Sequence, residues 1–295
     1  MTKLNKKIFI HMGYPKCLST SLQRFFFSKH DEINYFGVGS DTGIDYATTE
    51  IEYIFEILMK YSRNDVFDYH LASMRKHIAD VYRPSKVNLV SSEHLLMNFT
   101  LQGIDPEQKI DRLTRLFKDY EIEVIVIERD KSALIKSLYN EYIKMGYYES
   151  FETFERWVVS FADRNFLYDL DYHRKKQLLS RNFRKIHWLK FETLINGDTS
   201  ANINKKFTKI LNIRNLNLNI GKANESLTDD QVEALRCINE KHRREMGSQI
   251  NEAFEHHRNR SLFEFHDFDI SEEEIYQNVI LKRQAYNLLF DELDK

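Results

Sequence analysis

Short runs of β-branched and apolar residues alternate with longer helical patterns along this chain. This alternation restricts the possible fold classes more than any other feature of the sequence. The runs cover residues 7–12, 87–91, 122–127 and 184–189. Most are continuously apolar, as in strands that are buried on both faces of a parallel sheet. Parallel neighbours require long crossovers, which are usually helices, so the sequence predicts a doubly wound α/β sheet.

Helical periodicity fills the segments between these runs and continues beyond the last one. The predicted helices cover residues 18–29, 50–63, 65–82, 107–120 and 132–145, and an aromatic-rich stretch at 151–181 is expected to cover the sheet. Capping boxes begin at Thr228 and Ser271, and apolar residues recur at helical spacing over 272–293. We therefore expect one α/β domain over residues 1–295, largely helical from about residue 198.

Composition excludes several classes of protein. Lys+Arg number 43 and Asp+Glu 45, so a net charge of -2 provides no general attraction to nucleic acid. The two cysteines, Cys17 and Cys237, are far apart and form neither a disulfide framework nor a metal-ligand cluster. The basic start of the chain is followed by too few apolar residues for a signal peptide, and no apolar run is long enough for a membrane helix. A cytoplasmic protein is expected, with its oligomeric state open.

Polar residues and a lysine follow the first predicted strand. Ligands of open α/β sheets bind beyond the carboxyl ends of the strands, and residues 13–21 (GYPKCLSTS) lie there. The next helix begins with free backbone N–H groups, which bind anions, and Lys16 adds a positive charge. Gly13 allows unusual backbone angles and Pro15 fixes one. The segment does not match G-x-x-x-x-G-K-[ST], because no second glycine precedes Lys16.

The order of residues in this loop resembles a different family. Residues 14–20 (YPKCLST) are similar to the 5′-phosphosulfate loop Tyr-Pro-Lys-Ser-Gly-Thr-Thr of sulfotransferases that use 3′-phosphoadenosine 5′-phosphosulfate (PAPS). The resemblance implies a P-loop-like three-layer sandwich with a central parallel sheet and additional C-terminal helices. It also implies that the loop binds PAPS through Tyr14, Pro15, Lys16, Cys17, Leu18, Ser19, Thr20 and Ser21. Leu18 departs from the family glycine and would prevent the closest approach of the ligand.

A second part of the chain resembles the 3′-phosphate site of the same family. There an arginine ends a strand and a serine lies on the following helix, as Arg129 and Ser137 are expected to do here. An arginine binds phosphate with two parallel hydrogen bonds, and the serine adds a hydroxyl. Residues 222–227 (KANESL) resemble an Asn-x-Ser-Leu segment of bacterial members, which implies that Lys222 and Asn224 lie near the 3′-phosphate.

Sulfuryl transfer resembles phosphoryl transfer in depending on positioning and charge stabilisation, and it requires no metal. Lys16 would stabilise charge on the leaving oxygen, and a base must take a proton from the acceptor. The run at residues 87–91 is followed by Glu93 and His94, either of which is a candidate for that base.

The sequence thus predicts a PAPS-dependent sulfotransferase that modifies a hydroxyl or amine, with a carbohydrate or glycolipid as the expected acceptor. Two alternatives stay open: a P-loop-like kinase that uses ATP and magnesium, and a non-catalytic relative that binds a nucleotide or a partner. The missing Gly-Lys order counts against the kinase, and Leu18 counts for the non-catalytic relative.

Overall fold

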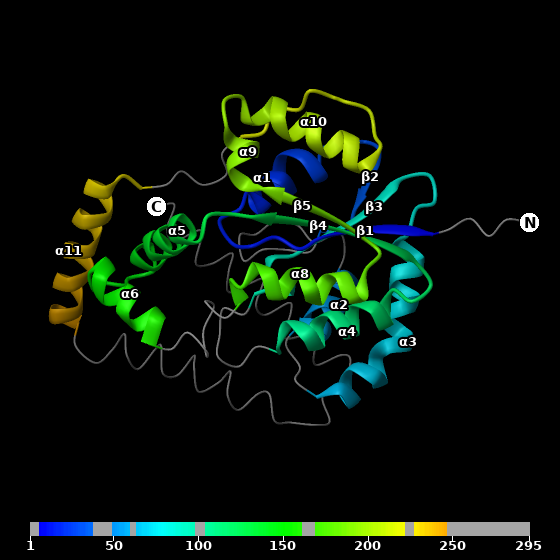
Figure 1. The fold of residues 1–295 in the computed structure, drawn as a ribbon. Coiled ribbons are helices and arrows are strands. Elements are labelled where there is room, and N and C mark those ends of the chain that lie inside the picture. The colour runs from blue at the N-terminus through cyan, green and yellow to red at the C-terminus, as the bar shows by residue number, and fades with distance from the viewer. Residues whose placement is uncertain are drawn as a thin grey trace, which may run out of the picture.

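A central sheet of parallel strands organises the protein (Figure 1). The computed structural model describes residues 6–37, 49–59, 63–97, 104–160, 169–221 and 227–246. The strands are β1 (Lys7–His11), β2 (Ile33–Tyr35), β3 (Val87–Ser91), β4 (Glu121–Glu128) and β5 (Lys185–Lys190), in the order β2-β3-β1-β4-β5. Every adjacent pair is parallel, so all the carboxyl ends meet at one edge of the sheet.

Helices cover both faces of the sheet and one end of it (Figure 1). One face carries α1 (Ser19–Leu22), α9 (Phe191–Ile195) and α10 (Thr199–Leu211). The other carries α2 (Thr49–Met59), α3 (Asn64–Val81), α4 (Pro106–Leu116) and α8 (Tyr172–Asn182). Beyond the carboxyl ends of the strands lie α5 (Lys131–Lys144), α6 (Phe151–Ser160) and α11 (Asp229–Met246). The predicted P-loop-like three-layer α/β fold is confirmed.

The four predicted strands are confirmed with small shifts at their ends, and β2 was missed. It is only three residues long, which is too short for a periodic pattern to show. The apolar runs are strands because both faces of the sheet are covered: Ile8, Ile10 and residues 124–127 of β4 are fully buried.

Two helix predictions need correction. The helix predicted at 18–29 is α1 followed by a π-helical segment (Gln23–Phe27), in which the N–H of Ser28 donates to the Gln23 carbonyl at 3.2 Å. The stretch 151–181 is divided between α6 and α8; α8 packs on β5, whereas α6 packs on α5. Residues 161–168 lie outside the described residues.

Capping chemistry explains where the later helices begin. Asp130 caps α5, which begins one residue before the predicted start at 132, because the Asp130 carboxylate accepts from the N–H of Ala133 at 2.9 Å. The predicted box at Thr228 is confirmed: its N–H donates to Gln231 Oε1 at 2.9 Å, and Gln231 N–H donates back to Thr228 Oγ1 at 3.3 Å. Ser271 and the pattern at 272–293 lie outside the described residues, so one domain over 1–295 stays a prediction.

Candidate functional site

The segment after β1 lies between the segments that follow β3 and β4. The N–H of Met12 donates to the carbonyl of Ile125 in β4 at 2.9 Å, and the N–H of Ser92 donates to the carbonyl of His11 at 3.0 Å. β4 runs on to Glu128, and Arg129 follows it. The sheet therefore brings the loop of residues 12–18, the turn after β3 and Arg129 together at its carboxyl edge.

The conformation of this loop depends on two left-handed residues. Lys16 has φ 59°, and Leu18, which stands before α1, has φ 68° and ψ 4°. Gly13 does not have a positive φ, so the expectation that it supplies unusual angles was wrong. A Cβ at Gly13 would lie 2.2 Å from Ser19 Oγ. Glycine at this position leaves room for the side chains of Ser19 and His11, which a Cβ would force to shift.

Leu18 therefore affects the backbone of the loop as well as the space beside a ligand. A left-handed conformation costs a residue with a side chain about 1–2 kcal/mol, and glycine adopts it freely. The side chain of Leu18 packs on the hydrophobic core, and this contact offsets part of that cost. At the position where the similar sulfotransferase loop has glycine, this chain therefore has a leucine whose backbone adopts a conformation that favours glycine.

Replacing Leu18 by glycine is expected to tighten binding of 3′-phosphoadenosine 5′-phosphate about threefold to tenfold, because the leucine side chain hinders the closest approach of a ligand to the loop. Leu18→Ala is the matched control, because it also removes the packing but keeps a Cβ on a left-handed backbone. Calorimetric titration with 3′-phosphoadenosine 5′-phosphate measures the difference. A glycine variant that binds no more tightly than the wild type would show that access at residue 18 does not limit binding.

Arg129 contacts the loop directly. Its Nη1 donates to the carbonyl oxygen of Lys16 at 2.8 Å, and its guanidinium lies 4.4 Å from the ring centroid of Phe191. Its Nε is buried and has no hydrogen-bond partner among the residues that the structure describes. The two predicted ends of the nucleotide site therefore lie on one edge of the sheet, in contact with each other.

The ammonium group of Lys16 has a partner that the sequence did not reveal. Its Nζ lies 2.9 Å from Oε2 of Glu141 on α5, and Lys144 lies 3.5 Å from the same oxygen. Burial raises the pKa of Glu141, but the two lysines lower it further than burial raises it. Ser137 stands one helical turn before Glu141, so both residues lie on the face of α5 that meets Lys16.

Among the other loop residues, some have side chains that are buried, and others carry hydroxyl groups at the start of α1 that could bind a ligand. Tyr14, Pro15 and Cys17 are buried, so they can offer a ligand only main-chain groups. The Tyr14 hydroxyl donates to the carbonyl of Asp169 at 3.2 Å, and burial raises the pKa of the Cys17 thiol, which favours its neutral form. Ser19, Thr20 and Ser21 start α1. Ser19 is 2% exposed, and its Oγ has no hydrogen-bond partner within the described ranges.

The two candidate bases stand on a short turn at the same edge. Glu93 and His94 belong to a 3₁₀ helix (Glu93–Leu95), where Ser92 Oγ accepts from the N–H of His94 at 3.2 Å. Glu93 is near enough to Cys17 for its charge to help raise the pKa of the thiol. Lys109 on α4, which is 2% exposed, donates to the His94 carbonyl at 2.6 Å and so ties this turn to α4.

A buried ion pair lies next to the loop, because the residue whose carbonyl accepts from Tyr14 is also a member of that pair. The side chain of Lys175 on α8 is fully buried, and its Nζ lies 2.8 Å from Oδ1 of Asp169. Burial lowers the pKa of the neighbouring Lys109 to about 8, and Lys175 adds to that effect while Asp169 opposes it. The pair was missed because a lysine in an exposed-looking helix gives no sign of burial.

Two of the predicted binding residues, Lys222 and Asn224, lie outside the described residues. In the part of the chain that is described, no group of three or more His, Cys, Asp and Glu is placed to hold a metal ion. Every helix in those ranges is too short or too polar to cross a bilayer.

Comparison with known proteins finds a likeness among solved structures. No family model matches the chain, and no curated protein matches it. The chain is similar to a sulfotransferase from Alicyclobacillus acidocaldarius, with 14% sequence identity and a TM-score of 0.45. The alignment covers 80% of this chain and 92% of that one. A likeness of this size does not establish a family, and the functional assignment comes from the residues of the site.

Proposed function

We propose that this protein transfers a sulfuryl group from PAPS to a hydroxyl or amine of an acceptor. The observation that carries the proposal is the contact between Arg129 and the Lys16 loop at the carboxyl edge of the sheet. Lys16 and Arg129 carry positive charge, and α1 begins directly after the same loop at Ser19, where no side chain caps it.

The buried polar atoms of the site fit an anion. Ser19 Oγ and Arg129 Nε lack hydrogen-bond partners among the described residues, and a buried donor without a partner costs about 1–3 kcal/mol. Phosphate oxygens accept hydrogen bonds from both groups. Lys16, Ser19, Thr20 and Ser21 would hold the 5′-phosphosulfate, and Arg129 with Ser137 would hold the 3′-phosphate; Lys222 and Asn224 are proposed to join them.

PAPS supplies the activated sulfuryl group when it is bound. Lys16 would then neutralise negative charge where the leaving oxygen separates, and the hydroxyls of Ser19 and Thr20 would keep the adjoining phosphate in place. Glu93 or His94 would accept the proton from the acceptor oxygen or nitrogen. Lys109 keeps the backbone of their turn in place through the His94 carbonyl.

The acceptor is proposed to be a carbohydrate or glycolipid, and the protein is proposed to act in the cytoplasm. Both proposals come from the resemblance and composition of the sequence. The described residues after α5 include many aromatic rings, which suit stacking on sugars. Two of them, Tyr147 and Phe151, already pack edge-on against Tyr139 of α5.

A thermal-shift titration separates this function from the two alternatives. At a concentration of one hundred times its Kd, 3′-phosphoadenosine 5′-phosphate is expected to stabilise the protein by about 2.7 kcal/mol and raise Tm by about 5 °C. ATP with magnesium is expected to shift Tm much less. A larger shift with ATP would favour a kinase and contradict the proposal, and a nucleotide shift without sulfuryl transfer to any acceptor would favour the non-catalytic relative.

A further inference from the structure

Glu141 lies between two lysines, one in the loop and one in its own helix. Its Oε2 is 2.9 Å from Lys16 Nζ and 3.5 Å from Lys144 Nζ. The side chains of Lys16, Glu141 and Lys144 are 21%, 39% and 32% exposed, so none is locked in the interior. The carboxylate can therefore change its partner by rotating its side chain, while the backbone stays in place.

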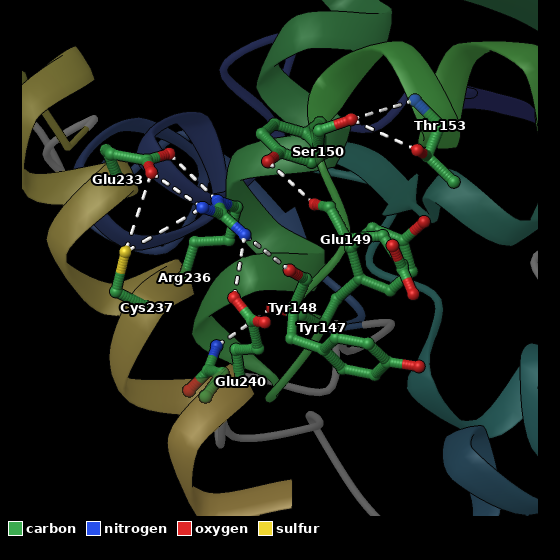
Figure 2. A network of polar contacts seen from close by, with 11 residues as sticks. Tyr147, Tyr148, Glu149, Ser150, Thr153, Glu233, Arg236, Cys237 and Glu240 are labelled. Atoms are coloured by element: carbon green, nitrogen blue, oxygen red, sulfur yellow. Dashed lines mark hydrogen bonds and ion pairs between the residues drawn. The ribbon is translucent and has the colours of Figure 1, made fainter. Parts of the chain in front are cut away.

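The backbone of this part of α5 is held firmly by α11. Asn239 Nδ2 donates to the carbonyls of Ile143 at 2.7 Å and Tyr147 at 2.9 Å, and Arg236 Nη1 donates to that of Tyr148 at 3.0 Å. Figure 2 shows Arg236 inserted between Tyr148 and the acidic side chains of α11. These bonds satisfy carbonyls at and beyond the end of α5, and they keep Glu141 and Lys144 beside the loop.

The pair between Lys16 and Glu141 conflicts with anion binding at Lys16. A carboxylate at hydrogen-bond distance neutralises the ammonium charge, and it would also repel a phosphate or sulfate that approached the same Nζ. Lys144 offers Glu141 a second cationic partner on the same helix, three residues away. Once the Glu141 carboxylate had turned toward Lys144, Lys16 would pair with the anion alone.

We propose that Glu141 is a positioning residue that holds Lys16 in the free protein and passes to Lys144 when an anionic nucleotide takes Lys16. The proposal rests on the function proposed above, in which Lys16 binds the 5′ end of the nucleotide. The strength of the Glu141 pair thereby limits how much Lys16 adds to the affinity for the nucleotide. Lys144 lowers the free-energy cost of separating Glu141 from Lys16, because it offers the carboxylate a new partner.

A double-mutant cycle tests the exchange of partners. Glu141→Gln is expected to tighten binding of 3′-phosphoadenosine 5′-phosphate about threefold to tenfold, the range that a partly exposed ion pair and one repelling charge provide. Lys144→Met is expected to weaken binding about threefold when Glu141 is present and to have little effect beside Glu141→Gln. Asp80→Asn is the matched control, because its exposed carboxylate pairs with Lys76 on α3, away from the loop.

The contact itself is measured without any nucleotide. The acylation rate of the Lys16 amine, followed by peptide mass spectrometry, is expected to rise in Glu141→Gln and to be unchanged in Asp80→Asn, because only the first substitution releases Nζ. A rise in labelling together with tighter nucleotide binding and a non-additive cycle supports the proposal.

Three results would overturn it, each in a recognisable way. Unchanged labelling of Lys16 would show that Glu141 does not hold the lysine, whatever the nucleotide does. Increased labelling with unchanged or weaker nucleotide affinity, or an additive cycle, would show that Glu141 and the nucleotide do not compete for Lys16. The proposed function would be unaffected by that result. Increased labelling with no nucleotide binding by any variant would overturn the proposed function, and the exchange of partners with it.

Discussion

Substituting Lys16 by alanine is expected to lower kcat about 100- to 1000-fold, the loss typical of removing one group that stabilises transition-state charge. Lys16→Arg keeps the charge but not the compact ammonium group, so it is expected to recover nucleotide binding better than turnover. Sulfuryl transfer from PAPS to a panel of sugar acceptors, together with the Kd of 3′-phosphoadenosine 5′-phosphate, measures both effects.

The fold should survive this change. The pair with Glu141 is partly exposed on both sides, so its loss costs about 1 kcal/mol or less. Lys136→Ala is a suitable control, since Lys136 is an exposed lysine of α5 whose partner is Asp229. A Lys16→Ala protein that melts like the wild type and keeps full turnover would remove Lys16 from the mechanism.

Asp169→Ala is expected to destabilise the protein by about 3–5 kcal/mol, because it leaves the ammonium of Lys175 buried without its partner. Both side chains are almost completely inaccessible, at 4% for Asp169 and 0% for Lys175. Urea denaturation followed by circular dichroism measures the change in the free energy of unfolding.

A second variant shows whether the lost pair is the cause. Asp169→Ala combined with Lys175→Met removes both charges and fills most of the lysine volume, so it should regain much of the lost stability. A single variant within about 1 kcal/mol of the wild type would mean that the pair is far more hydrated than its burial indicates.

The features that could be predicted from sequence are those with a local pattern. Continuous apolar runs identify β1 and β4 because both faces of the sheet are covered, and a strand followed by hydroxyls and a lysine indicates an anion loop. The position of Arg129 follows from its place after β4, since parallel strands end at one edge. The contact of Arg129 with the Lys16 carbonyl then depends on the loop conformation, which residue types alone do not specify.

The features that were missed depend on contacts between distant segments. Glu141 is one of many acidic residues on helices, and only the packing of α5 beside the loop makes it the partner of Lys16. The same holds for Lys175 with Asp169 and for Lys109 with the turn after β3. Leu18 was recognised as a departure from the family glycine, but its left-handed φ became visible only in the structure. The spacing of apolar residues shows which face of a helix is buried, but it does not show which other segment packs against that face.

A crystal structure with 3′-phosphoadenosine 5′-phosphate shows directly whether the carboxyl edge binds both ends of the nucleotide. We expect the 5′-phosphate on the main-chain N–H groups and hydroxyls of residues 16–21, with Lys16 Nζ turned from Glu141 toward it. The 3′-phosphate should lie within hydrogen-bond distance of Arg129 and Ser137. A nucleotide bound elsewhere, or one whose 3′-phosphate faces solvent away from Arg129, would contradict the assignment of the carboxyl edge as a sulfotransferase site.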